Sequence, residues 1–309
     1  MNKYKRLLVV IDPTTDHQPA LTRAVHLASK TGAEIHALMC IYDFSYEMTT
    51  MLSVQEREVM REAVISSRSE WLENVLEAHK VPVTATTHVE WHNRPFEAVI
   101  RYGLEHSMNL IIKATRSHDS LKSVIFTPTD WHLLRKAPMP VLLVKEHEWP
   151  EHGNVIAAID AGNDDDSHKG LNQEIISKAQ SVAALVQAEV HLVNSFPGTP
   201  LNIAVEIPDF DPDSYTEAVE KYHTTQVDLL GEEFGIAKTN RHVKEGLPED
   251  VIPSIARNVD AELVVMGTIG RTGISAALIG NTAEHVIDQL NCDVLAIKPT
   301  EFDCPIAID

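Results

Sequence analysis

The second half of the chain repeats the first, and this repeat restricts the possible fold more than any other feature. From Pro95 onward the two halves align without a gap at an offset of 153 residues, so that Pro95 corresponds to Pro248. A repeat of this length has the size of an ordinary domain with its own core. The apolar segments that correspond are residues 110–112 with 263–265, and residues 141–145 with 294–298.

Each half reads as an alternation of short apolar strands and segments with helical spacing. The opening strand of each half ends in an aspartate, in KRLLVVID at residues 5–12 and in NVIAAID at residues 154–160. Short apolar strands that alternate with helices are typical of parallel sheets, because parallel strands need a long crossover connection. We therefore predict an α/β protein with two doubly wound domains, residues 1–150 and 151–309, each with a five-stranded parallel sheet.

Local signals predict where several elements begin and end. Gly32 follows the apolar pattern of the first helix and is predicted as its C-cap. Two longer polar stretches, at about residues 43–53 and 196–215, follow the second strand of each half, and the second of them, with its four prolines, is predicted as a loop. The second of them leads into a helix that is expected to begin near Asp213. Residues 147–153 show neither helix nor strand periodicity and are predicted to contain the domain boundary.

Composition and charge exclude several classes of function. The formal net charge of −19 argues against a protein that binds nucleic acid or an acidic membrane surface by neutralising phosphates. No apolar run approaches the roughly 20 residues that span a bilayer, and the run from Leu7 to Ile11 is too short for a signal peptide. The three cysteines, Cys40, Cys292 and Cys304, show no metal-binding spacing. We therefore expect a reduced, cytoplasmic environment.

Residues 267–282 carry the most chemical information. Gly267, Gly270 and Gly280 form the pattern G-x2-G-x9-G between an apolar strand pattern and a helix pattern. Glycine lets backbone N–H groups approach an anion closely, and a helix N-terminus adds unsatisfied donors and a favourable dipole. This order indicates a phosphate-binding loop. Arg271 lies inside the loop, either as a phosphate contact or as a solvated arginine.

The first half has lost all three glycines of this pattern. The corresponding residues are Ala114, Ser117 and Thr127, so a side chain stands at each point of close approach. Pro128 also removes a backbone donor at the position of Asn281. We therefore expect that the first domain does not hold a phosphate ligand in the same manner.

With these features the chain resembles the universal stress protein family, and its arrangement is most similar to the E-type tandem members of enterobacteria. The resemblance covers both halves and rests on Asp12 and Asp160, on the turn at residues 246–248 and on the glycine loop. It implies flavodoxin-like (Rossmann-like) domains, a cytoplasmic role in stress response and DNA-damage resistance, and ATP binding where the glycine motif is kept. It also implies an internal pseudo-dimer of the two halves and leaves a further homodimer open.

The resemblance assigns residues to an adenine nucleotide, ATP, in the second domain. It places Asp160 near the adenine and ribose and the backbone of Val193 beside the adenine. Asp12 is followed by Pro13, and we expect it to cap a turn instead. The family motif has Ser or Thr directly after its last glycine, where this chain has an asparagine that can still cap the helix. The loop residues assigned to the phosphates are Gly267, Thr268, Gly270, Arg271, Gly280, Asn281 and Thr282.

The sequence bears on two metals, Mg²⁺ and zinc, as cofactors. The acids at residues 164–166 are typical of solvated surface, and near a phosphate they favour a complex of the nucleotide with Mg²⁺. The 16 histidines show no spacing of a structural zinc site, so we expect no functional zinc. The corresponding pairs His36/His191 and His88/His242 are predicted to pack or hydrogen-bond inside the fold.

Three functions remain open from the sequence. The first is a regulatory stress protein that binds ATP in its second domain. The second is a slow Mg²⁺-dependent ATPase that uses Asp160, although residues 267–282 contain no lysine of the P-loop type and efficient catalysis is not expected. The third is a scaffold in which both domains have lost the nucleotide.

Overall fold

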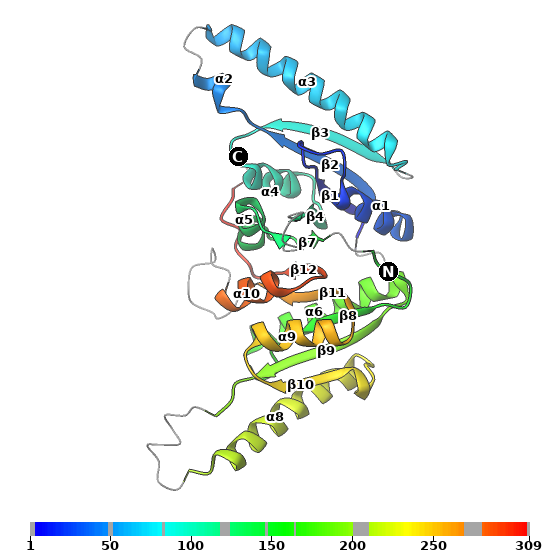
Figure 1. Cartoon of the computed structure of the whole chain (residues 1–309), viewed down its shortest axis with the longest axis vertical. Helices are drawn as coiled ribbons and strands as arrows, with labels where there is room; N and C mark the ends of the chain where they lie inside the picture. The colour runs from blue at the N-terminus through cyan, green and yellow to red at the C-terminus, as the bar shows by residue number, and fades with distance from the viewer. Residues whose placement is uncertain are drawn as a thin grey trace. The chain divides into compact units, whose positions relative to one another are not determined.

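The computed structural model of the chain describes residues 4–48, 52–81, 84–117, 124–145, 148–163, 165–199, 210–268 and 280–307. The chain forms two compact units. The first unit comprises Met1–Glu146 together with Asp303–Asp309, and the second comprises His147–Phe302. In each unit, helices pack against a sheet whose strands alternate with them along the chain (Figure 1).

In the first unit the sheet strands are β1 (Arg6–Val10), β2 (Glu34–Ile41), β3 (Ala85–Trp91), β4 (Leu110–Ala114) and β7 (Val141–Val144). The helices are α1 (Pro19–Thr31), α2 (Phe44–Met48), α3 (Val54–Ala78), α4 (Pro95–Glu105) and α5 (Pro128–Lys136). A separate antiparallel pair joins β5 (Arg116–Ser117) to β6 (Val124–Ile125).

In the second unit the strands are β8 (Asn154–Ala158), β9 (Glu189–Phe196), β10 (Arg241–Glu245), β11 (Ala261–Gly267) and β12 (Asp293–Ile297). The helices are α6 (Asp166–Val186), α8 (Pro212–Glu233), α9 (Pro248–Asn258) and α10 (Asn281–Gln289). A single 3₁₀ turn, η1 (Lys238–Asn240), precedes β10.

Each unit contains a five-stranded parallel sheet, as the repeat predicts. The order is β3-β2-β1-β4-β7 in the first unit and β10-β9-β8-β11-β12 in the second, and each of these neighbouring pairs is parallel. The chain builds outward from β1 or β8 on one side and then returns to build on the other. The order therefore reverses between β1 and β4, and between β8 and β11, which confirms the doubly wound architecture.

The central strands are apolar because helices cover both faces of the sheet. Leu7, Leu8 and Val9 of β1 are fully buried, as are Ile156 and Ala157 of β8. Helix α1 packs against β1, β2 and β4, and α6 packs against the corresponding β8, β9 and β11. The later helices pack on each other, α4 on α5 and α9 on α10 (Figure 1).

Several predicted element ends are confirmed by the backbone. Gly32 has a φ of 70° and its N–H donates to the Ala28 carbonyl, so it is the C-cap of α1. Pro248 is the first residue of α9, after Gly246 with a φ of 137°. Helix α8 begins at Pro212, where the Asp211 side chain accepts from the N–H groups of the first turn.

The first of the two polar stretches, at about residues 43–53, contains the short helix α2, which the sequence pattern does not predict. The Asp43 carboxylate accepts hydrogen bonds from the Ser45 N–H at 2.9 Å and from the Ser45 hydroxyl at 2.5 Å. An aspartate that caps the following residues in this way starts a helical turn without any apolar periodicity.

Two further features are the character of the helices and the state of the cysteines. In the part of the chain that the structure describes, no helix combines the length and the apolar composition needed to cross a membrane. Helix α3, with 25 residues, buries only Leu72, Val75 and Leu76. The three cysteines form no disulfide.

Candidate functional site

The predicted site residues of the second unit gather at one edge of its sheet. Asp160 follows β8, Gly267 ends β11, and Thr268 comes directly after it. Gly280 is the N-cap of α10. Strands β8 and β11 are neighbours, and the strand order reverses between them. In open α/β sheets, ligands bind in the crevice at such a reversal, beyond the carboxyl ends of the strands.

Part of the predicted glycine loop lies outside the residues that the structure describes. Gly270 and Arg271 lie outside the described residues, and of Asn281 only the backbone is described, as the first residue of α10. Thr282 follows with an exposed side chain. Gly280 has a φ of −62° and a ψ of 135°, which any residue adopts, so its backbone conformation does not require glycine.

Gly267 has a packing reason to be glycine. A Cβ atom at this position would lie 2.8 Å from Leu171 Cδ2 on α6. The absence of a side chain therefore lets α6 lie close to the end of β11. The equivalent Ala114 of the first unit carries the methyl group.

Thr268 connects the strand ends to the start of α10. Its N–H donates to the Ile297 carbonyl at 3.2 Å, and its carbonyl accepts from the Gly280 N–H at 3.4 Å. Its hydroxyl oxygen accepts from Lys298 Nζ at 2.5 Å. Thr268 thus brings together β11, the end of β12 and the N-terminus of α10.

Lys298 is a site residue that the sequence analysis missed. Its side chain is only 7% exposed, and its ammonium lies 5.2 Å from the centre of the Phe302 ring. Burial lowers the pKa of Lys298 to about 7. The sequence shows this residue only as the last letter of the repeated VLAIK segment. Its contact with Thr268 joins positions 30 residues apart and is visible only in the folded chain.

Asp160 presents its side chain to solvent from a turn that is held firmly by its backbone. Its N–H donates to Asn172 Oδ1 at 3.0 Å, and its carbonyl accepts from Asn172 Nδ2 at 2.8 Å. The next N–H, of Ala161, donates to Asn194 Oδ1 at 2.8 Å. These side chains come from α6 and β9, so two elements hold the backbone of the turn that carries Asp160.

His223 of α8 packs on the same turn. Its Nδ1 accepts from Asn194 Nδ2 at 2.9 Å, and its ring stacks on Phe196 with 5.5 Å between the ring centres. A Cβ atom at Gly162 would lie 2.2 Å from His223 Cε1, so the ring needs this glycine. Burial lowers the pKa of His223, against the opposing effect of the Asp160 charge. No local sequence signal distinguishes this histidine.

Val193 lies deeper in the sheet than the other predicted contacts. Its side chain is fully buried, and its carbonyl accepts from the Ile159 N–H at 3.0 Å. The backbone acceptor is therefore used within the sheet. Ser195 lies two residues nearer to the carboxyl edge of β9. A contact of Val193 with the adenine stays a prediction.

The first unit repeats the aspartate turn with a different use of the carboxylate. Gln18 takes the place of Asn172, because its Oε1 accepts from the Asp12 N–H at 3.1 Å and its Nε2 donates to the Asp12 carbonyl at 2.8 Å. Asp12 Oδ1 accepts from the Thr14 N–H at 2.9 Å and from the Thr14 hydroxyl at 2.6 Å. Asp12 therefore caps its own turn, as predicted.

A buried ion pair stands where the first unit has lost the glycine loop. Lys113 Nζ lies 2.6 Å from Asp130 Oδ1, and the Asp130 side chain is 0% exposed. Asp130 Oδ2 also accepts from the N–H of Thr127 at 2.6 Å and from its hydroxyl at 2.8 Å. The corresponding residues of the second unit are Met266 and Ala283, so this ion pair has no equivalent there.

The predicted histidine pairs lie inside the two units. His191 Nδ1 and His242 Nε2 are 3.0 Å apart, and His36 Nδ1 lies 3.0 Å from the Tyr102 hydroxyl. The His88 ring packs on the Tyr102 ring at 5.3 Å. These contacts confirm the predicted packing and hydrogen bonding. The described residues include no group of three or more His, Cys, Asp and Glu side chains arranged to hold a metal ion.

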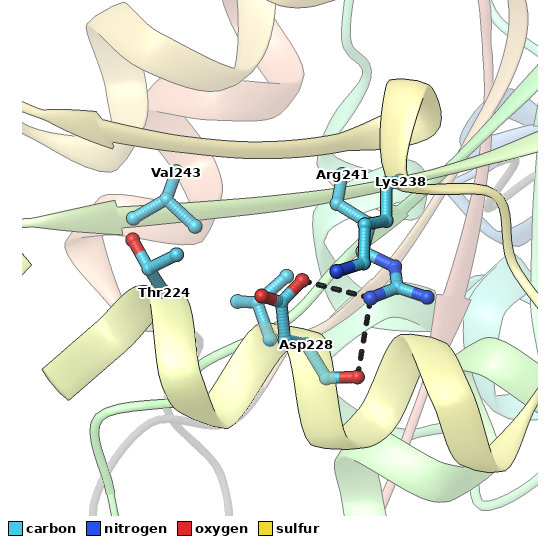
Figure 2. A pocket seen from close by; sticks show the side chains of 6 residues that line it. Thr224, Asp228, Lys238, Arg241 and Val243 are labelled. Atoms are coloured by element: carbon cyan, nitrogen blue, oxygen red, sulfur yellow. Dashed lines mark hydrogen bonds and ion pairs between the residues drawn. The ribbon is translucent and has the colours of Figure 1, made fainter. Parts of the chain in front are cut away.

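A hollow of about 260 Å³ lies elsewhere, between α8 and β10. Figure 2 shows the Arg241 guanidinium pointing at Asp228, whose carboxylate and carbonyl both accept from it, at 2.8 and 3.3 Å. Arg241 is the first residue of β10 and therefore lies at the amino edge of the sheet. The hollow is thus at the opposite edge from Asp160, Gly267 and Thr268.

Comparison with known proteins is consistent with this arrangement. The model of the Universal stress protein family matches the chain twice, at residues 3–145 and 153–298. The chain is 48% identical over 311 aligned residues to universal stress protein E of Escherichia coli (strain K12), with 100% of this chain and 98% of the relative covered. It is 38% identical to the universal stress protein E homolog of Haemophilus influenzae, with 97% and 99% covered.

Solved structures of other proteins are similar to this chain over nearly its whole length. A functionally unknown protein from Pseudomonas aeruginosa PAO1 is 31% identical, with a TM-score of 0.73 and 97% of this chain and 94% of that chain covered. A universal stress protein from Archaeoglobus fulgidus, at 16% identity and a TM-score of 0.62 with 98% and 100% covered, shares the fold. Two matches to one family model and full-length relatives confirm the predicted resemblance, including the E-type tandem arrangement. The chain therefore belongs to the universal stress protein family.

Proposed function

We propose that the protein is a stress-response regulator that binds ATP in its second domain, residues 151–309. One observation carries the proposal: Asp160, Gly267, Thr268 and the N-terminus of α10 converge at the strand-order reversal of the second unit. An exposed carboxylate at this edge is suited to accept hydrogen bonds from ribose hydroxyls. A helix N-terminus beside it is suited to phosphates.

The first domain, residues 1–150, is not proposed to bind the nucleotide. Its carboxylate at Asp12 is used by Thr14, and the buried pair of Lys113 and Asp130 stands at the lost glycine loop. The nucleotide would act by a shift in population. If ATP binds one arrangement of the second domain more tightly, binding changes what the protein associates with. The predicted pairing of the two halves and a further homodimer stay predictions.

The test is the nucleotide content and ATP affinity of the purified protein. Small molecules released from the wild type are identified by mass spectrometry, and ATP with Mg²⁺ is titrated by calorimetry. Asp160→Ala removes an exposed carboxylate, and we expect weaker ATP binding without loss of stability. Asp12→Ala is the matched control in the first unit and should bind ATP like the wild type. Gly280→Val adds a side chain at the start of α10 and should also weaken binding.

Two other functions are outcomes of the same experiment. A wild type that neither carries nor binds nucleotide would overturn the proposal and favour the scaffold function. Bound ATP that is slowly converted to ADP would favour the Mg²⁺-dependent ATPase, and an unchanged rate in Asp160→Asn would remove Asp160 from that reaction.

Of the acids proposed for Mg²⁺, Asp165 caps α6 through the His168 N–H at 2.9 Å. Asp164 and the Asp166 side chain lie outside the described part.

A further inference from the structure

Two asparagine side chains hold the backbone of the turn after β8, and one of them depends on a histidine. Asn172 binds both backbone groups of Asp160. Asn194 binds the next residue, because its Oδ1 accepts from the Ala161 N–H at 2.8 Å. Asn194 is fully buried, so the orientation of its amide decides whether this N–H has a partner.

The Asn194 amide has one orientation that satisfies all of its neighbours. While Oδ1 accepts from Ala161, Nδ2 donates to the Ser195 carbonyl at 3.2 Å and to His223 Nδ1 at 2.9 Å. A flipped amide would put its NH₂ group against the Ala161 N–H and its oxygen against the Ser195 carbonyl. Both backbone groups would then lose their hydrogen bond to Asn194. The network therefore fixes the amide.

The same network fixes the protonation of His223. Because Asn194 presents an N–H group to Nδ1, this nitrogen must accept, and the proton of the neutral ring lies on Nε2. In the protonated ring both nitrogens carry hydrogen, so the Nδ1–H group would face the Asn194 N–H group. The ring can thus take up a proton only if the contacts of Asn194 break. Burial lowers the pKa of His223, in agreement with a neutral ring.

The first unit has neither the backbone donor nor the asparagine. Pro13 stands at the position of Ala161 and has no N–H to satisfy. Met39, a fully buried apolar side chain, stands at the position of Asn194. In each unit this position lies one residue beyond the partner of the last residue of β1 or β8. The two differences go together, so the need of the Ala161 N–H for a partner explains the asparagine.

We propose that His223 is a positioning residue of the candidate site: its neutral ring holds the Asn194 amide and, through it, the turn that carries Asp160, so that protonation of the ring weakens ligand binding. The inference rests on the proposed nucleotide site and adds its regulation by pH. The ring acts through Asn194 and not by contact with the ligand. The second domain should therefore release its ligand in mild acid.

The groups around the ring assign this pH response to His223 itself. The charge of Asp160 favours the protonated ring, and the larger effect of burial opposes it. Tyr222 meets the ring edge at 5.7 Å between the centres, and a phenol titrates far above neutral pH. Strand β10 also packs on α8, and its charged residues on that face are Arg241 and Glu245. Arg241 is paired within α8 and β10, and Glu245 is the last residue of its strand.

The first experiment needs no ligand. NMR of the ring nitrogens at pH 7.5 should show a neutral His223 with its proton on Nε2. As the pH falls towards 5, the Ala161 amide resonance should move together with protonation of this ring. In His223→Asn the carboxamide oxygen accepts in place of Nδ1, and the Ala161 resonance should stay constant. A proton on Nδ1, or an Ala161 resonance that does not follow the ring, would overturn the inference.

The second experiment is a calorimetric titration with ATP and Mg²⁺ at pH 7.5 and 5.5. The wild type should bind about tenfold more weakly at pH 5.5, the size expected for one lost buried hydrogen bond. ATP itself takes up a proton in this range, so the decrease is compared with that of His223→Asn. This variant meets the same ATP, should bind like the wild type at pH 7.5 and should show a smaller decrease.

Two further variants complete the comparison. His223→Phe keeps a ring without an acceptor and should bind ATP about tenfold more weakly than the wild type even at pH 7.5. His36→Asn changes a histidine inside the first unit and should follow the wild type at both pH values. Thermal unfolding verifies the fold of each variant, and His223→Asn decides the question if His223→Phe does not fold. Equal pH profiles of the wild type and His223→Asn would overturn the inference.

Failure of the two proposals is distinguishable. If the wild type binds no ATP, the proposed function fails, and the NMR experiment still decides whether His223 controls the turn. If ATP binds and His223→Asn leaves the pH profile unchanged, the positioning role fails and the proposed function stands.

Discussion

The segment after the fourth main strand differs between the two units, although the strands and helices around it correspond. In the first unit it contains the short antiparallel pair β5–β6, and a buried lysine and aspartate join β4 to the first turn of α5. In the second unit it carries the glycine motif, and Lys298 donates to the hydroxyl of Thr268 at the end of β11. In the first unit, an ion pair within the protein therefore joins the end of β4 to the start of α5.

This difference teaches how a repeated domain can separate stability from ligand binding. An ion pair that is fully formed inside the protein fixes the helix start whether or not a ligand is present. A ligand that binds the folded second unit would instead add stability in proportion to the logarithm of its concentration. The following predictions test this contrast, from the largest expected effect to the smallest.

The Asp130→Ala variant should have the largest effect, because it leaves the Lys113 ammonium beside the helix start without its carboxylate. Breaking a buried ion pair at one partner costs about 3–5 kcal/mol. The free energy of unfolding of the first unit is measured in urea by tryptophan fluorescence. Trp71, Trp91 and Trp131 all belong to this unit.

The matched control is the double variant Lys113→Met with Asp130→Ala, which copies Met266 and Ala283 of the second unit. Replacement of both charges by apolar groups is often close to neutral, so most of the lost stability should return. An equal loss of unfolding free energy in the single and double variants would show that the ion pair does not stabilise the first unit.

The threonines after β4 and β11 should differ in importance. Thr268→Val removes an acceptor of the buried Lys298 ammonium, and a hydrogen bond to a charged group is worth about 1.5–3 kcal/mol. Thr115→Val removes a neutral bond to the Val144 carbonyl, worth about 0.5–1.5 kcal/mol. Urea unfolding of both variants measures the difference. A greater loss in Thr115→Val would contradict the role assigned to Lys298.

The histidine pair of the second unit should make its stability fall in mild acid. Burial lowers the pKa of His191 against the charge of Glu189, and burial together with His191 and Lys244 lowers that of His242. Because the folded state favours the neutral rings, their contribution is complete above the unfolded pKa of about 6.5. It is lost progressively as the pH falls from there through the lowered folded values.

The measurement is the urea midpoint of the second unit between pH 7.5 and 5. His242→Gln keeps a neutral hydrogen-bonding side chain and should make the midpoint less dependent on pH. His88→Gln, at the corresponding place in the first unit, is the control and should leave the pH profile of the second unit unchanged. An identical profile for His242→Gln and the wild type would assign the acid sensitivity to other groups.

The sequence alone determined the architecture of each unit. The repeat, the apolar strands and the helix signals are local properties, and a parallel α/β sheet follows from them because each strand needs a helical crossover before the next. Gly32 and Pro248 could be placed at element ends because the backbone conformation of a cap depends on one or two residues. Helix α2 was missed because its start depends on the Asp43 side chain and not on periodicity.

The candidate site was only partly predictable. Asp160 and the glycines could be found because each has a local signal: Asp160 ends an apolar strand, and the glycines form a motif that is continuous in sequence. Their supports, Asn172, Asn194 and His223, come from other elements and carry no local signal. Two contacts join residues that lie 17 and 30 positions apart: Lys113 with the Asp130 carboxylate, and Lys298 with Thr268. Only the tertiary structure decides this, because it is the packing of strand ends against a helix N-terminus that brings these charges together.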